Sequence, residues 1–294
     1  MKNWKHVLRV LAGVLTFACI ATAADAPKLT FKFTTIDVKG SLSTNTFAIN
    51  NDGVMVGIYI DSSGTLHGLK LVGGKATNID DPKATQGTYC YGINSSGAIV
   101  GAYGTSSGGS QGFLYQGGKF TDVGPAGSPY SEAEGINDKG EIVGDYVDSS
   151  GVEVGFRWNG KKGGQYKTLH HPGSVYTAAK GINNRGLITI QWGNMSGNSE
   201  AALYNGKKYI RIDVPGAVSS VPLKIDAAGD VAMIWADSSG FAHGALRMGG
   251  KYYKFNDPNG LSDTHADGIN DHRTIVGWFV PPGKSTSLGF KATY

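Results

Sequence analysis

The chain has 294 residues, of which 45 are glycine, 10% are aromatic and 17% are charged. This composition is typical of many short strands joined by tight turns, and it excludes a mainly helical protein and a disordered tail. Three positive charges lie within the first nine residues, so the formal charge of +4 does not indicate a nucleic-acid-binding surface.

The first 23 residues have the pattern of a secretory signal peptide. Lys2, Lys5 and Arg9 precede an apolar run over residues 10–20, which is too short to span a membrane as a helix. Residues 21–23, Ala-Thr-Ala, form the small-x-small pattern that a signal peptidase accepts. We therefore predict cleavage near Ala23 and a secreted or periplasmic protein. Acylation of Cys19, as in a lipoprotein, is the alternative.

The predicted mature chain, residues 24–294, is close to neutral. Loss of the three N-terminal charges lowers the formal charge from +4 to +1. No cluster of Lys and Arg remains to contact a phosphate backbone, so nucleic acid is not an expected partner. Cys90 is then the only cysteine, which excludes an intramolecular disulfide and favours a buried apolar role for its side chain.

Variants of the motif Gly-Ile-Asn-x-x-Gly recur along the chain. Its isoleucine stands at six places separated by 44, 43, 46, 43 and 44 residues: Ile49, Ile93, Ile136, Ile182, Ile225 and Ile269. A constant period of this length indicates a repeat architecture.

Each repeat contains four strand-like segments. In the first repeat they cover residues 46–50, 54–59, 67–71 and 76–80, separated by turns rich in Asn, Asp and Gly. Asn, Asp and Gly tolerate the left-handed backbone region that hairpin turns require, so turn chemistry explains these residues and no metal site is predicted. Glycines inside the second and third segments are interpreted as positions where neighbouring blades approach too closely for a side chain.

Four short antiparallel strands in about 44 residues are typical of one blade of a β-propeller. The sixth repeat ends at Tyr294 after its third strand, and the segment over residues 31–37 resembles the missing fourth strand. Pairing these two segments would close the ring and remove an exposed strand edge. We therefore predict an all-β fold, a single six-bladed β-propeller domain over residues 24–294.

The repeat also resembles a known family. The run Gly-Ile-Asn-x-x-Gly-x-Ile-Val-Gly, followed by Ser-Gly, His/Gln-Gly-Phe and Gly-Lys, is similar to the extracellular HAF repeats, which are named for a His-Ala-Phe triplet. The triplet has the form His67-Gly68-Leu69 or Gln111-Gly112-Phe113 here, so the similarity depends on the whole pattern. The resemblance implies an exported bacterial repeat protein and does not imply a ligand.

The variable positions precede each anchoring isoleucine. The loops from each fourth strand to the next first strand lie at one end of the ring, where rigid scaffolds commonly carry binding residues. Positions two and four residues before the isoleucine differ from repeat to repeat, and they supply the ligand-binding candidates: Tyr89, Tyr91, Glu132, Glu134, Lys180, His265 and Asp267.

These observations predict a non-catalytic binding or structural module, with a polysaccharide or an envelope protein as partner. No catalytic residue, cofactor or metal is assigned, because the chain has no nucleophile elbow, phosphate loop or Cys-His signature. We expect a monomer without a membrane span in the mature chain. The alternative is a hydrolase or lyase that acts on an extracellular glycan or peptide through Glu132, Glu134, Lys180 and His265.

Overall fold

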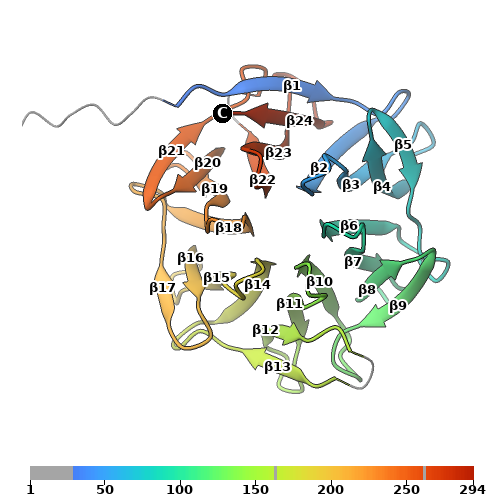
Figure 1. Ribbon diagram of the computed structural model, residues 1–294, viewed down its shortest axis with the longest axis vertical. Helices are drawn as coiled ribbons and strands as arrows, with labels where there is room; N and C mark the ends of the chain where they lie inside the picture. Colours follow the sequence, from blue (N-terminus) through green and yellow to red (C-terminus); the bar gives the residue numbers. More distant parts are fainter. Residues whose placement is uncertain (1–28, 162–163, 261–262) are drawn as a thin grey trace, which may run out of the picture. The chain divides into compact units, whose positions relative to one another are not determined.

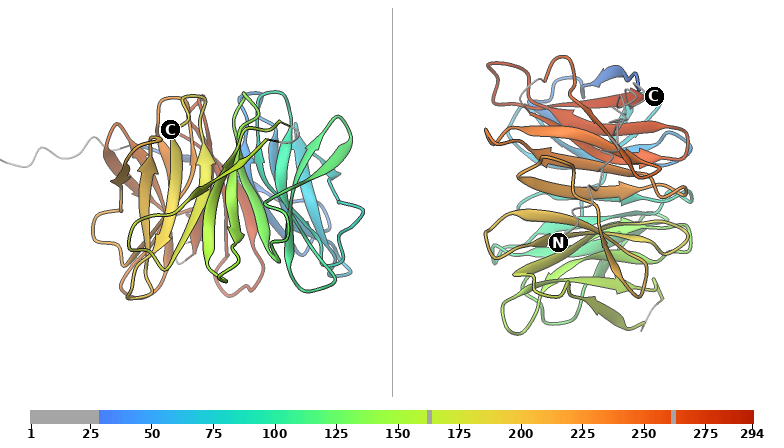
Figure 2. Two further views of the ribbon diagram at one scale, coloured as in Figure 1. Left: turned by 90° about the horizontal axis from the view of Figure 1, so that it is seen from below. Right: turned by 90° about the vertical axis from the view of Figure 1, so that its left-hand side faces the viewer.

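Short strands make up the regular structure of this protein. The computed structural model describes residues 29–161, 164–260 and 263–294, and within these ranges it contains 24 strands and no helix. The predicted signal peptide lies outside the described residues. The unit from Phe31 to Tyr294 contains six four-stranded antiparallel sheets arranged as blades around a central axis (Figure 1), and Figure 2 shows these blades from two further sides. The predicted six-bladed propeller is confirmed.

The strands repeat in the same order in each blade. The innermost strands are β2 (Ser43–Ile49), β6 (Thr88–Ile93), β10 (Ser131–Ile136), β14 (Tyr176–Ile182), β18 (Ser219–Ile225) and β22 (Thr264–Asn270). The second strands are β3 (Met55–Ile60), β7 (Ile99–Gly104), β11 (Ile142–Val147), β15 (Ile188–Gly193), β19 (Val231–Ala236) and β23 (Thr274–Phe279). The third are β4 (Leu66–Val72), β8 (Ser110–Gln116), β12 (Glu153–Trp158), β16 (Ser199–Tyr204), β20 (Ala242–Met248) and β24 (Leu288–Thr293). The outermost are β5 (Lys75–Asn78), β9 (Lys119–Val123), β13 (Tyr166–Leu169), β17 (Tyr209–Arg211), β21 (Lys251–Phe255) and, for blade six, β1 (Lys32–Ile36).

Blade six joins the two ends of the propeller. Strand β1 pairs antiparallel with β24, from Lys32 opposite Thr293 to Ile36 opposite Gly289. Phe33 lies between the rings of Phe255 in blade five and Phe290 in blade six, at centroid distances of 5.9 and 5.5 Å. The N-terminal strand therefore completes the last blade as the repeat pattern predicted.

The apolar cores lie between neighbouring blades. Phe113 of blade two and Phe156 of blade three are fully buried, and each packs in a cluster that contains residues of two adjacent blades. Burial of one such ring contributes about 1.5–3 kcal/mol. Cys90 is buried in the cluster between blades one and two, which confirms the apolar environment expected for it.

The asparagine of the repeated motif connects each blade to the next. Asn50 Oδ1 accepts hydrogen bonds from the amides of Asp52 and Val54, and this holds the first hairpin turn. Asn50 Nδ2 donates across the blade boundary to the carbonyl of Asn94 at 3.2 Å. The same bond recurs from Asn94, Asn137, Asn183 and Asn270 to the following blade. We call these residues the asparagine ring, and the end of the channel at which they lie the turn end.

Blade five interrupts the asparagine ring with Asp226, and an ionised carboxylate has no hydrogen to donate towards blade six. Burial raises the pKa of Asp226, so its stabilising contribution is largest in acid and is lost as the pH rises through this raised pKa. We expect Asp226→Asn to supply the missing donor and increase the free energy of unfolding by about 1 kcal/mol at pH 8. The gain should be smaller at pH 4. Guanidinium unfolding at both pH values checks this, and a destabilised variant at pH 8 would refute it.

Candidate functional site

Each innermost strand carries an irregularity that directs one side chain into the channel. In β10 the register shifts between Ala133 and Gly135, so Glu134 has no partner residue in β11. A β-bulge of this kind bends the strand and re-aims a side chain. The same shift leaves equivalent residues unpaired in four other blades: Phe47, Tyr91, Lys180 and Asp267.

The second-strand glycines accommodate these bulges. A Cβ atom on Gly144 would lie 1.9 Å from the carbonyl oxygen of Glu132 in the same blade. Gly57, Gly101 and Gly277 face their own innermost strands in the same way. The interpretation of these glycines as contacts between blades was therefore wrong for the second strand, because the bulge of the same blade occupies the space. It is partly correct for the third-strand Gly112, where a Cβ atom would lie 2.5 Å from the carbonyl oxygen of Val123 in the same blade and 3.1 Å from the amide nitrogen of Ala133 in the next blade.

Blade five departs from the pattern. Its register shift spans Pro222 to Ile225, so both Leu223 and Lys224 are unpaired. Pro222 has no amide hydrogen and cannot continue the ladder as a donor. The wider irregularity places both Leu223, which stands two residues before the isoleucine, and Lys224 at the channel.

These residues enclose a cavity at the end of the channel that carries the loops between blades. Its volume is about 130 Å³, and it is lined by Phe47, Tyr91, Glu134, Leu223, Lys224 and Asp267. A water molecule occupies about 30 Å³ in the liquid, so several waters or one small polar group can enter. We call this cavity the loop-end cavity. A ring of isoleucines separates it from the turn end, where the asparagine ring lines another cavity.

The composition of the loop-end cavity changes around its circumference. Blades one and two supply Phe47 and Tyr91, whose rings lie 5.7 Å apart. Blades three to six supply charged side chains in the order Glu134, Lys180, Lys224 and Asp267. Two neighbouring blades therefore form an aromatic part of the rim, and the other four blades form a charged part.

A buried ion-pair network occupies the charged part of the rim. The ammonium of Lys180 lies 2.8 Å from Glu134 Oε1 and 3.4 Å from Asp145 Oδ1. Lys224 lies 3.6 Å from Glu134 Oε2, and it donates a hydrogen bond of 2.8 Å to the carbonyl of Lys180. Only 8% of the Glu134 side chain and 2% of the Asp145 side chain are exposed. Water screens these charges weakly, so each one strongly affects its neighbours.

The network divides the carboxyl groups by protonation. Burial opposes ionisation of Glu134, yet the charges of Lys180 and Lys224 hold its pKa below the ordinary value. Burial raises the pKa of Asp145 well above its ordinary value. Burial and the charge of Glu134 raise the pKa of Glu132 to about 7. Glu134 therefore carries the negative charge of the network at neutral pH, while Glu132 is about half protonated.

The structure brings some of the predicted candidates together and separates others. Tyr91, Glu134 and Asp267 line the loop-end cavity, and Lys180 binds Glu134 beside it. Tyr89 stacks on Tyr91 with 5.9 Å between ring centroids.

Two candidates have other partners. Glu132 lies 3.5 Å from the hydroxyl of Tyr91 and 3.4 Å from that of Ser110, at the rim of blade three. His265 stacks on Trp278 at 3.8 Å and pairs with Asp263 at 2.9 Å, and it does not line the cavity. The four residues of the enzymatic alternative therefore do not all converge.

Sequence reasoning missed Asp145 and Lys224, although each leaves a signal in the repeat. Asp145 stands where blades one and two have the buried apolar residues Ile58 and Ala102. Lys224 stands directly before the anchoring isoleucine, where other repeats have Ala or Gly. A charged residue at a position that is otherwise small or apolar indicates a buried partner of opposite charge.

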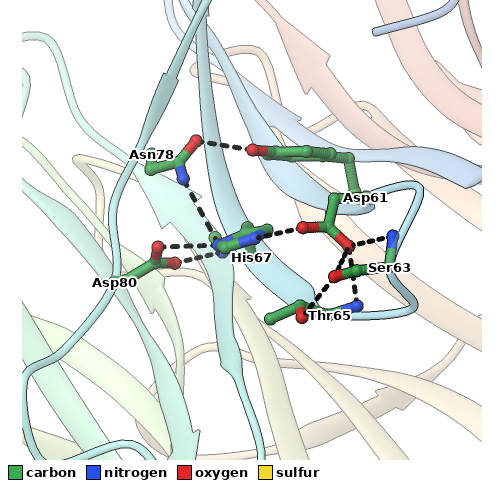
Figure 3. A network of polar contacts seen from close by, with 8 residues as sticks. Asp61, Ser63, Thr65, His67, Asn78 and Asp80 are labelled. Atoms are coloured by element: carbon green, nitrogen blue, oxygen red, sulfur yellow. Dashed lines mark hydrogen bonds and ion pairs between the residues drawn. The ribbon is translucent and has the colours of Figure 1, made fainter. Parts of the chain in front are cut away.

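The histidine of the repeated triplet has a structural role at the edge of blade one. His67 Nδ1 lies 2.8 Å from Asp80 Oδ2, and its Nε2 lies 3.4 Å from Asp61 Oδ2 (Figure 3). Asp61 also accepts hydrogen bonds from the amides of Ser63 and Thr65. This network fastens the turn between β3 and β4 to the outer edge of the blade.

The network around His67 recurs in blade five, where His243 contacts Asp237 and Asn256.

In the part of the chain that the structure describes, no three His, Cys, Asp or Glu side chains are grouped to hold a metal ion. The described residues also include no helix that is long and apolar enough to cross a membrane.

Comparison with known proteins identifies the fold. No protein-family model matches the chain, and no curated protein matches it either. Among solved structures, a variant of the Aleuria aurantia lectin in complex with Fucα1-6GlcNAc is similar at 13% identity and a TM-score of 0.53, over 88% of this chain and 93% of that one. The SapL1 lectin in complex with α-methyl fucoside is similar at 11% identity and a TM-score of 0.57, over 86% and 94% of the two chains. The putative TolB from Agrobacterium tumefaciens is similar at 17% identity and a TM-score of 0.57, over 72% and 80%.

Proposed function

We propose that this protein is a non-catalytic binding propeller whose ligand enters the loop-end cavity. The observation that carries the proposal is the convergence of bulged residues from five blades on one cavity, with Lys180 of blade four bound to Glu134 beside it. A structural ring does not need bulges that place buried charges on its axis, and such charges reduce stability unless they are paired. Rigid scaffolds that hold polar and aromatic groups around a concavity are typical of ligand sites.

The expected partner is a polysaccharide or an envelope protein met outside the cytoplasm. The signal pattern of the first 23 residues and the resemblance to HAF repeats support this location. Tyr91, Phe47 and Tyr89 offer ring faces on which a sugar or an aromatic side chain can stack. The similarity to lectins described with fucosides and to TolB supports a binding role at the level of the fold.

The test is a glycan array probed with labelled residues 24–294, in parallel with cross-linking to envelope proteins. The partner identified is then titrated against Tyr91→Ala and against Tyr253→Ala, which removes an aromatic ring from the outermost strand of blade five. We expect at least a tenfold loss of affinity for Tyr91→Ala only. Equal affinities of the two variants would place the ligand elsewhere and contradict the proposal.

One observation supports the alternative that the protein is a hydrolase or lyase. Glu132 and Glu134 belong to the same strand, yet their environments move their pKa values in opposite directions. Neighbouring carboxyl groups separated in this way can act as acid and base. Turnover of an identified glycan or peptide by the wild type, and its loss in Glu132→Gln, would establish this alternative. Binding without turnover would exclude it.

A further inference from the structure

Within the part of the chain that the structure describes, Asp267 is the acidic residue of the loop-end cavity that lacks a counter-charge within contact distance. Its Oδ2 atom is shielded from solvent and has no hydrogen-bond partner among the described residues. The other acidic residue of the lining, Glu134, contacts both Lys180 and Lys224. A shielded carboxylate oxygen without a donor costs free energy, and such a cost is commonly retained at a functional site.

Lys224 lines the same cavity, but its ammonium group pairs with residues other than Asp267. Its ammonium contacts Glu134 at 3.6 Å and donates to the Lys180 carbonyl at 2.8 Å. The described network contains four carboxyl groups, Glu132, Glu134, Asp145 and Asp267, and two ammonium groups. Both ammonium groups are therefore paired with other residues, Lys180 with Glu134 and Asp145, and Lys224 with Glu134.

The aromatic part of the rim is adjacent to Asp267 around the ring of blades. Blade one, which supplies Phe47, follows blade six, and Gly268 approaches the backbone of Phe47 and Ala48. A cation beside Asp267 therefore meets Phe47 and then Tyr91 along the same wall. Aromatic faces together with a carboxylate attract ammonium groups through cation–π and charge-assisted contacts.

Building on the proposed function, we infer that the loop-end cavity recognises a primary ammonium group, which Asp267 binds and the rings of Phe47 and Tyr91 flank. The ammonium supplies the counter-charge that Asp267 lacks, and its binding favours the ionised form of this carboxyl group. A lysine side chain and an amino sugar both carry this group.

The test is an NMR titration of residues 24–294 with two pairs of probes. One pair is Nα-acetyl-lysine methyl amide and its Nε-acetylated counterpart, and the other is glucosamine and N-acetylglucosamine. We expect at least one free amine to bind tenfold more tightly than its acetylated counterpart. A preference for the lysine probe identifies a polypeptide source, and a preference for glucosamine identifies a glycan. If neither amine exceeds its acetylated counterpart, the inference is wrong.

Asp267→Asn supplies a second readout. Burial raises the pKa of Asp267 well above its ordinary value, so the folded wild type loses stability as the pH rises through that value. We expect Asp267→Asn to lose amine binding at least tenfold while its melting temperature at pH 8 rises by about 2–4 °C. Asp52→Asn, an exposed change of the same charge at the turn end, should alter neither quantity.

Two outcomes separate the inference from the proposed function. If an array or cross-linking partner depends on Tyr91 but no free amine is preferred, the binding function stands and the ammonium assignment fails. If Asp267→Asn binds amines as tightly as the wild type, the assignment also fails, whatever its stability.

Discussion

Deletion of residues 24–40 is expected to open the ring and leave a protein that aggregates. The deletion removes β1, so β24 loses its backbone partner from Gly289 to Thr293 and becomes an exposed edge. It also removes Phe33 from its contacts with Phe255 and Phe290. Unpaired edges recruit other chains, and the loss should be on the order of 5 kcal/mol, comparable with the whole stability of many domains.

A shorter truncation provides the control. A chain that begins at residue 31 retains β1 and should remain a soluble monomer with nearly unchanged stability. Size-exclusion chromatography and guanidinium unfolding of the two truncations measure the difference. A soluble, equally stable monomer without residues 24–40 would show that β1 does not close the propeller.

Replacement of Lys180 by Met is expected to reduce the free energy of unfolding by about 3 kcal/mol at pH 7. The change leaves Asp145 without its 3.4 Å partner and Glu134 with Lys224 alone. Removal of one of the two cations beside Glu134 is costly because its buried negative charge is then only partly compensated, and water cannot replace the lost partner. The lowered pKa of Glu134 means that its stabilising contribution is present above its ordinary pKa and is lost in acid. The difference from the wild type should therefore narrow at pH 4.

Lys83→Met is the matched comparison for this prediction. Lys83 pairs with Asp122 at 2.7 Å, but 59% and 45% of the two side chains are exposed. Exposed pairs contribute at most about 1 kcal/mol. Denaturant unfolding of both variants at pH 4 and pH 7 tests the contrast. Similar small losses at pH 7 would mean that the charges on the channel axis are solvated.

Much of the architecture was predictable because the repeated residues act locally. Asn137 caps its own hairpin turn through bonds to Lys139 and Glu141, and this happens wherever the motif occurs. Closure was also predictable, because residues 31–37 match the strand that the last repeat lacks. The bonds from each asparagine to the next blade were not anticipated, since nothing in one repeat shows where its neighbour's carbonyl lies.

The candidate site was predicted only in part. Positions two residues before the isoleucine do face the channel, as expected, because the bulge occurs at the same place in most blades. The contribution of blade five was not predictable in this way, because its irregularity spans Pro222 to Ile225 and adds the charged Lys224 to Leu223 in the lining of the cavity. The spacing of His265 in the repeat predicted a position beside the other candidates. Its side chain instead stacks on Trp278 and pairs with Asp263, both in blade six.

Ligand binding at the loop-end cavity is tested most directly by NMR, from the changes in backbone amide chemical shifts when the ligand is added. Residues 24–294 are titrated with the partner that the array or cross-linking identifies. We expect the largest shifts at the residues that line the cavity: Phe47, Tyr91, Glu134, Leu223, Lys224 and Asp267. Shifts confined to the asparagine ring or to the outermost strands would contradict the claim.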